Sequence, residues 1–199
     1  MEYRYSPEFK QLIQNEELVK SFLTGSHVTG FDFKLWEKRR SFIADAIKKD
    51  GTILDIGCAN GLLLRSLQEW SEHRLVPFGI DIEPKSIEKA KALFPANANN
   101  FVLLPIEELD KIGEKGLPDK FDFIYWHVWD SVSFEGGEEK WVKSAVEHML
   151  KGGRLILGFY DSRESNSEKI ETLESLGFKI DGVEINKSGE EIICWIDRP

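Results

Sequence analysis

The spacing of apolar residues along the chain alternates between a helical repeat and short unbroken runs. Two stretches before residue 50 have the helical repeat. The first opens at Ser6-Pro7-Glu8, which is an N-cap residue, a first-turn proline and an acid, and continues to Gly25. The second ends at Asp50-Gly51, a C-cap signal. Later runs rich in β-branched and aromatic residues predict strands at 52–56, 75–82, 101–104, 121–129, 154–160, 178–185 and 191–196.

Helical patterns lie between most of these runs. One begins after residue 61, and two cover about 86–93 and 138–149. A further one ends at Gly177, before the last two runs. Alternation of strands and helices favours a parallel sheet covered on both faces. Asn186-Lys187-Ser188-Gly189 is typical of a hairpin turn, which makes one strand antiparallel. We therefore expect an α/β fold with a doubly wound, mostly parallel sheet at 51–199 and an N-terminal helical extension at 1–50.

The first strand leads into a glycine turn that is the most informative stretch of the sequence. Gly57 and Gly61 allow a ligand to approach the backbone, and the amides that open the next helix point into the same space. The spacing is G-x-x-x-G, which differs from the G-x-G-x-x-G of dinucleotide binders. Asp55 would repel a pyrophosphate but would pair with an ammonium group. A zwitterionic amino-acid ligand therefore fits this turn best.

Leu54-Asp55-Ile56-Gly57-Cys58-Ala59-Asn60-Gly61 resembles the first motif of class I S-adenosylmethionine-dependent methyltransferases. The resemblance extends over roughly residues 50 to 197 and implies a seven-stranded Rossmann-like sheet with S-adenosylmethionine as the cofactor. It also implies a set of cofactor-binding residues. These are Asp55, Gly57, Cys58 and Gly61 around the methionine end, Asp81 at the ribose, and Ile82, Ile106 and Glu107 around adenine.

Two of these positions leave alternatives open. Asp81 lies 20 residues after Gly61, where a carboxylate at the end of the neighbouring strand can accept hydrogen bonds from ribose hydroxyls. It also suits a turn or helix-capping role. Pro105 stands where members of the family often have an acid that contacts adenine. Because proline has no amide hydrogen, any such contact has to come from Ile106, Glu107 or the backbone.

The exit of the fourth strand carries the candidate catalytic chemistry. His127 is the candidate general base, because imidazole titrates near neutral pH; the alternative is a histidine that is only hydrogen-bonded at a strand end. Trp126 and Trp129 are candidate acceptor contacts, through an apolar surface or by holding a cationic amine. Tyr125 is a further candidate. Since alternate side chains of a strand face opposite ways, these aromatic residues cannot all line one pocket.

The N-terminal helices precede the family's core pattern, and the connection from Gly25 to Asp32 is polar and flanked by glycine. One hypothesis makes residues 1–50 a lid that contributes acceptor contacts from His27, Phe31 or Trp36. The alternative is that these helices pack on the sheet and complete the core, as their apolar faces suggest.

Composition and charge argue against several other classes. The net charge is −9, and Lys38-Arg39-Arg40 is the only tight basic cluster, which we interpret as a solvated helix face; nucleic acid is therefore not an expected partner. Cys58 and Cys194 lack zinc or disulfide spacing and are expected to pack. Asp130 and Asp161 match metal-dependent methyltransferases poorly, so no metal is expected. No apolar run approaches about 18 residues and the N-terminus lacks a signal core, which predicts a cytoplasmic protein without membrane contact.

The sequence therefore predicts a methyltransferase that moves a methyl group from S-adenosylmethionine to an oxygen or nitrogen of a small molecule or side chain. A protein that binds the cofactor without transfer is an alternative, because the same pocket serves both. A nicotinamide-dependent oxidoreductase is a further alternative, although Asp55 and the glycine spacing disfavour it. The pattern makes no prediction of oligomeric state.

Overall fold

A seven-stranded sheet with the strand order β3-β2-β1-β4-β5-β7-β6 forms the centre of the computed structural model, which describes residues 3–24, 32–160 and 162–199. The five strands β3 to β5 along this order are parallel, and β7 runs antiparallel to both β5 and β6. The expected fold class is confirmed. The strands are β1 Gly51–Ile56, β2 Leu75–Asp81, β3 Phe101–Leu103, β4 Phe121–His127, β5 Met149–Phe159, β6 Gly182–Ile185 and β7 Ile192–Asp197.

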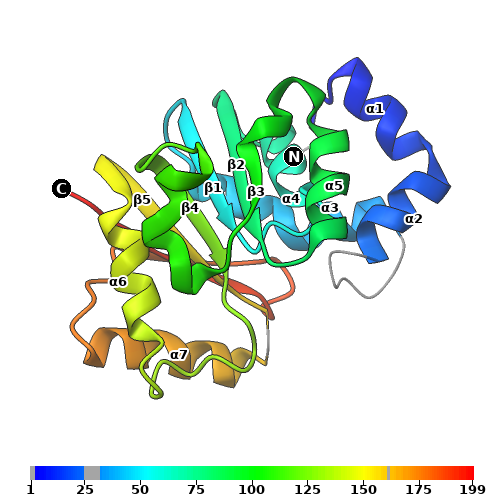
Figure 1. Cartoon of the computed structure of the whole chain (residues 1–199). Coiled ribbons are helices and arrows are strands. Elements are labelled where there is room, and N and C mark those ends of the chain that lie inside the picture. The colour runs from blue at the N-terminus through cyan, green and yellow to red at the C-terminus, as the bar shows by residue number, and fades with distance from the viewer. Residues whose placement is uncertain (1–2, 25–31, 161) are drawn as a thin grey trace.

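Helices cover both faces of the sheet (Figure 1). One face packs against α1 Pro7–Gln14, α2 Glu16–Thr24, α3 Phe33–Arg40, the 3-10 segment η1 Ser41–Ala46, α4 Leu62–Trp70 and α5 Pro84–Leu93. The other face packs against η3 Ile106–Lys115, α6 Glu139–Glu147 and α7 Arg163–Ser175. A further 3-10 segment, η2 Pro95–Asn100, precedes β3. Each face therefore has its own apolar core.

The N-terminal helices share one core with the sheet. Phe9, Leu23 and Ile43 are fully buried together with Ile53 of β1 and Ile193 of β7. Burial of such side chains contributes about 1.5–3 kcal/mol each, so this packing is a substantial part of the stability. The helices consequently complete the helical layer on this face, which is what the packing alternative expects.

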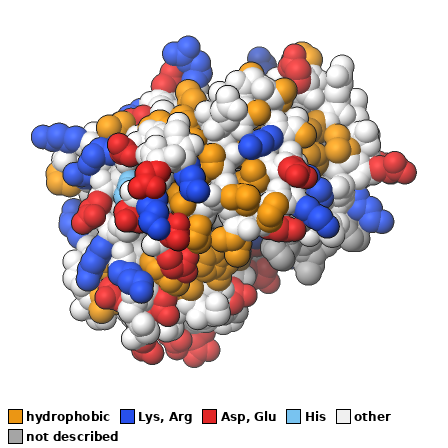
Figure 2. All heavy atoms as spheres, viewed as in Figure 1, with side chains coloured by type: hydrophobic (Ala, Val, Ile, Leu, Met, Phe, Trp, Pro, Cys, Tyr) orange, Lys and Arg blue, Asp and Glu red, His pale blue; other side chains and the backbone are white. Residues whose placement is uncertain are grey.

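The surface of the molecule carries charged side chains of both signs. Figure 2 shows acidic and basic side chains interspersed over one face, with hydrophobic side chains gathered near its centre.

Several element boundaries differ from the sequence-based expectation. The first helix is two helices, because Asn15 leaves helical geometry with ψ 93° and its side chain accepts a hydrogen bond from the Leu18 amide. The second helix ends at Arg40 and continues as η1. The polar stretch after β3 forms η3, which buries Ile106, Leu109 and Ile112. Apolar spacing alone did not indicate these changes, because it does not report a capping side chain such as Asn15 or the exact residue at which a helix ends.

Among the helices of the described residues, none combines the length and apolarity needed to cross a membrane.

Candidate active site

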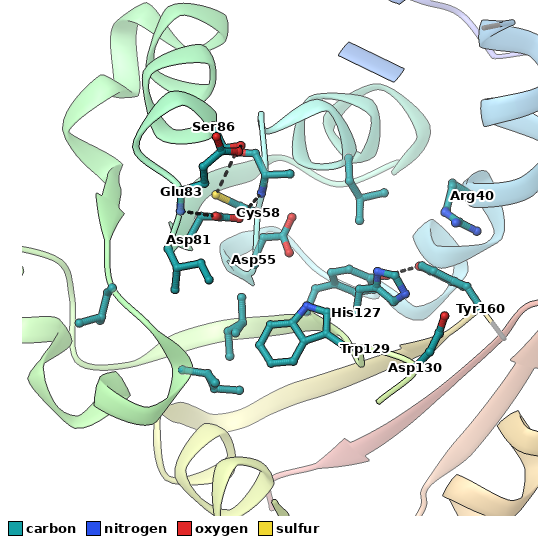
Figure 3. A pocket seen from close by; sticks show the side chains of 18 of the residues that line it. Arg40, Asp55, Cys58, Asp81, Glu83, Ser86, His127, Trp129, Asp130 and Tyr160 are labelled. Carbon is teal, nitrogen blue, oxygen red and sulfur yellow. Dashed lines mark hydrogen bonds between the residues drawn. The ribbon is translucent and has the colours of Figure 1, made fainter. Parts of the chain in front are cut away.

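A cavity of about 750 Å³ opens at the carboxyl ends of β1, β2 and β4 (Figure 3). In a parallel α/β sheet the loops that leave these strand ends converge on one edge, where ligands bind. Two groups of residues line opposite parts of this cavity. We call Asp55–Ala59 and Asp81–Glu83 the turn end. We call Trp36, Arg40, Tyr125, His127, Trp129, Asp130 and Tyr160 the aromatic end.

Positive φ angles shape the turn that follows β1. Gly57 has φ 75° and Ala59 has φ 47°, while the Gly57 and Cys58 amides both donate to the Ile80 carbonyl at 2.8 and 2.9 Å. A Cβ at Gly57 would meet nothing closer than the Trp129 ring at 3.8 Å. Gly57 therefore supplies both the left-handed backbone and open space in the cavity, as expected of a residue that a ligand approaches.

Gly61 has a different role from the one expected. It is the N-cap of α4 with φ 79°, and a Cβ there would lie 3.0 Å from the Phe94 ring and 3.3 Å from the Ala90 Cβ. Gly61 does not line the cavity. Its glycine is required by close packing of α4 against α5, and the expectation of a direct ligand contact is corrected.

Asp81 joins the two turns of this edge. Its Oδ2 accepts from the Ala59 amide and its Oδ1 accepts from the Glu83 amide, each at 2.8 Å. The carboxylate therefore has the turn role that the sequence left open. It also borders the cavity, and each oxygen keeps a lone pair that a ligand hydroxyl can use.

Asp55 is a buried carboxylate in the wall of the cavity. Its side chain is only 3% exposed, and no described residue donates a hydrogen bond to its carboxylate. Burial and then the negative charge of Asp81 raise its pKa well above the usual 3.8. A buried carboxylate without a partner is costly, so the site fits a ligand that brings an ammonium group.

Apolar residues border the cavity beyond Asp81. Ile82 is 74% exposed, whereas Ile106 is buried, and both line the cavity together with Glu107. Leu104 lines the cavity as well, although the sequence did not indicate this residue. It directly precedes Pro105, the residue before η3. This wall suits a flat apolar ring such as adenine.

Arg40 lies at the aromatic end in a position that the sequence misjudged. It is buried, forms an ion pair with Glu191, and places its guanidinium 3.4 Å from the centre of the Tyr160 ring. Burial alone would lower the pKa of Arg40, but Tyr160 and Glu191 outweigh it, and the net direction is upward. The expectation of a solvated basic face is therefore wrong at Arg40, because α3 packs this residue against the ends of β5 and β7.

Two tyrosines meet beside this pair. The hydroxyls of Tyr125 and Tyr160 share a hydrogen bond, and burial raises the pKa of Tyr160 to about 12. The ring of His127 lies 4.2 Å from that of Tyr160. Gly158 leaves room for the pair, since a Cβ there would lie 2.6 Å from the Tyr125 hydroxyl. The aromatic end is thus a set of mutually supported side chains, with His127 on the cavity wall as expected.

The tryptophans divide between the cavity and the core. Trp129 is 40% exposed and lines the cavity, as does Trp36, whose indole donates to the Ser66 hydroxyl at 3.0 Å. Trp126 is fully buried in the core on the opposite face of the sheet. The expectation that Trp126 contacts the acceptor is therefore corrected. Strand alternation explains it, because Tyr125 and His127 face the cavity and the residue between them cannot.

Other candidates have simpler outcomes. Cys58 and Cys194 are buried free thiols, and burial raises the pKa of the Cys58 thiol, so its packing role agrees with expectation although it also borders the cavity. Among the described residues no cluster of three or more histidine, cysteine or acidic side chains is placed to hold a metal. His27, Phe31 and Asp161 lie outside the described residues.

Comparisons with known proteins show the family of the chain. A family model described as a methyltransferase domain matches residues 28–179, which is more than half of the chain. The chain belongs to this methyltransferase family. The resemblance seen in the first motif is thus confirmed, and the protein is an S-adenosylmethionine-dependent methyltransferase of class I. This assignment sets aside the nicotinamide-dependent and non-catalytic alternatives.

Solved structures agree on the fold of the methyltransferase. A protein from Pyrococcus horikoshii is 19% identical with a TM-score of 0.65, covering 92% of this chain and 99% of that one. A chain of the complex between the Haloferax volcanii Trm112 methyltransferase activator and a methyltransferase is 14% identical with a TM-score of 0.62, covering 83% and 92%. Fibrillarin from Aeropyrum pernix, with natively bound S-adenosyl-L-methionine, is 16% identical with a TM-score of 0.56, covering 82% and 74%.

No curated protein matches the chain in sequence. The structural neighbours include a Methanococcus jannaschii fibrillarin named as a pre-rRNA processing protein. The comparisons therefore do not support the inference, made from the net charge, that nucleic acid is not a partner. They leave the class of acceptor undetermined.

Proposed function

We propose that the turn end of the cavity holds S-adenosylmethionine and that the aromatic end holds a small-molecule or side-chain acceptor with a reactive oxygen or nitrogen. The observation that carries this proposal is the single cavity that joins Asp55 and Asp81 to His127 and Trp129. The bound cofactor supplies a methyl group already activated on a sulfonium, so alignment and exclusion of water remain for the protein.

Different residues of the turn end bind different parts of the cofactor. Asp55 binds the ammonium group of the methionine moiety, which provides the charge partner that its buried carboxylate lacks. Asp81 accepts from ribose hydroxyls while its amide contacts hold the turn. Ile82 and Ile106 enclose adenine, with Glu107 at its edge. These assignments use the side chains that the cavity already places together.

At the aromatic end, His127 holds the proton that the acceptor loses, and Trp129 and Tyr160 exclude water around it. Trp36 and Arg40 bring the N-terminal extension into the cavity wall. The extension therefore acts as part of the acceptor site, and we propose that it closes further over the bound cofactor.

Binding of S-adenosylhomocysteine tests the proposed donor site. At about 100 times its dissociation constant, a ligand that binds only the folded state adds about 2.7 kcal/mol to stability, so the melting temperature should rise. Thermal unfolding with and without the ligand measures it. Nicotinamide nucleotides serve as the control. A melting temperature that stays flat at millimolar S-adenosylhomocysteine contradicts the proposal.

A pair of aspartate variants tests the ribose contact. Asp81→Asn should weaken S-adenosylhomocysteine binding by roughly 1.5–3 kcal/mol, because a charged acceptor is lost. Asp122→Asn is the matched control. Asp122 accepts from the Thr52 amide at 2.9 Å and pairs with Lys49 at 2.8 Å, away from the cavity, so its loss should lower stability without changing affinity. Titration calorimetry measures the affinity of both folded variants for S-adenosylhomocysteine. Equal affinities would mean that Asp81 has only its role in the turn.

A further inference from the structure

The cavity walls carry an excess of negative charge. Five carboxylates from the described residues line the cavity: Asp55, Asp81, Glu83, Glu107 and Asp130. The cation among the lining residues is Arg40, and its charge is balanced by the ion pair with Glu191. Tyr160 covers the guanidinium face. A ligand in this cavity therefore meets a field that favours cations.

Most of these carboxylates have partners or tasks at the turn end. Asp81 accepts from two backbone amides, and Glu83 accepts from the Ser86 hydroxyl at 2.9 Å. Asp55, only 3% exposed and without a donor among the described residues, independently indicates that a cation is expected in this cavity. The proposed function assigns the methionine ammonium to it.

Asp130 is the remaining carboxylate of the aromatic end. It lies on the loop after β4 and lines the same cavity as His127 and Tyr160, and Figure 3 labels all three. The Nζ of Lys169 fixes this loop from outside the cavity, because it lies 3.2 Å from the backbone carbonyl of Asp130 and 3.4 Å from that of Trp129. Lys169 thus holds the backbone rather than the carboxylate. Asp130 is exposed and lines the cavity, as does Trp129, the preceding residue.

We propose that the acceptor is an amine that enters the aromatic end as a cation, with its ammonium at Asp130 and its organic part against Trp129 and the adjoining, tilted rings of His127 and Tyr160. This inference rests on the proposed function. Carboxylate and aromatic faces together recognise an ammonium group, whereas a phosphate or carboxylate acceptor would face like charge.

The charge balance of amine methylation suits these walls. The ammonium first gives one proton to His127 or to water. The nitrogen lone pair then forms the N–C bond while the C–S bond breaks, and its electron pair stays on sulfur, which becomes neutral. The methylated nitrogen carries the positive charge that sulfur has lost. The two reacting groups therefore carry two positive charges when the amine enters, and one from the loss of the proton onward, first on sulfur and then on nitrogen. The negative walls of the cavity are complementary to a cation at each of these stages.

A matched set of ligands on the full chain tests this proposal. The protein is saturated with S-adenosylhomocysteine and titrated at pH 7 with 2-phenylethylamine, 2-phenylethanol and phenylacetate, which share a carbon skeleton. The amine should bind at least about tenfold more tightly than the other two. Asp130→Asn should reduce amine affinity about tenfold, whereas the exposed Asp110→Asn should not change it. S-adenosylhomocysteine should bind both variants as it binds the parent.

Each result of these titrations either supports or overturns the proposal. Measurable binding of the alcohol or the acid that equals or exceeds that of the amine overturns the proposal. So does an Asp130→Asn variant with unchanged amine affinity, and so does a lack of binding of every amine offered, free or in a peptide. A lysine-containing peptide forms a second arm. If it binds and the free amine does not, the ammonium belongs to a protein side chain and the amine class is supported. Binding of an RNA oligonucleotide in place of either amine overturns it. Failure of S-adenosylhomocysteine itself to bind would instead refute the proposed function.

Discussion

The two ends of the cavity are built in different ways. The turn end consists of two short segments, Asp55–Ala59 and Asp81–Glu83, joined by backbone amides that donate to one carboxylate. The aromatic end combines side chains from α3, β4, the loop after β4 and the residue after β5, and its Arg40 is paired with Glu191, the residue before β7. A site made of turns is specified locally and tolerates change elsewhere, whereas a site made of side-chain contacts depends on every element that contributes to it.

The largest expected effect concerns the aromatic end. Arg40→Met should cost about 3–5 kcal/mol of unfolding free energy, because it leaves Glu191 buried without its cation. Denaturant unfolding measures the loss. Adding Glu191→Gln should recover most of it, since the uncompensated charge is removed. Lys38→Met, on an exposed position of the same helix, should change stability by less than about 0.5 kcal/mol. If Arg40→Met is as stable as the parent, the ion pair between Arg40 and Glu191 does not stabilise the aromatic end.

The second effect concerns the turn end and acts on affinity. Asp55→Asn should weaken S-adenosylhomocysteine binding by roughly 1.5–3 kcal/mol, because the ligand ammonium loses its charged partner. Titration calorimetry measures it, and undiminished affinity would contradict the assignment.

The same variant should raise the stability of the ligand-free protein near neutral pH. The pKa of Asp55 is raised above 3.8 on folding, so its favourable contribution is present below 3.8 and is lost as the pH rises through the folded pKa. Asparagine never ionises. The melting temperature of Asp55→Asn should therefore exceed that of the parent increasingly as the pH rises, and the gap should close below 3.8. A difference in melting temperature that grows toward acidic pH would contradict this prediction.

The smallest effect connects the two ends. If α3 closes over a bound cofactor, S-adenosylhomocysteine should raise the hydrogen-exchange protection of amides in Phe33–Arg40 as well as in the turn end. Exchange followed by mass spectrometry gives both regions in one experiment. Protection confined to the turn end would leave α3 as a packing element.

The sequence predicts the turn end far better than the aromatic end, for a physical reason. The turn after β1 is contiguous, and its glycines and acid report their own conformation and charge. Even there, the contact of Gly61 with α5 depends on a helix that the motif does not contain. Alternation along β4 contained enough information to place Trp126 on the face opposite His127, once either residue was assigned to the cavity.

The aromatic end offered no comparable local signal. Arg40 stands in a basic run that is typical of a solvated helix, and only the approach of Tyr160 and Glu191 makes it a buried ion. Tyr160 follows a strand without any motif around it. Such residues become visible only when the tertiary structure shows which segments meet, because their role is defined by partners far away in the chain.

The pairing of Arg40 with Glu191 also bears on the order in which the protein is completed during synthesis. The strands that lead into the turn end, β1 and β2, emerge from the ribosome well before β7, which follows Glu191. Domains generally fold as units, and pairing between segments far apart in the chain is the slow part of folding. Arg40 is synthesised about 150 residues before Glu191, so it has no counter-ion until almost the whole chain has been made. The burial of this arginine is therefore one of the last steps that the chain can complete.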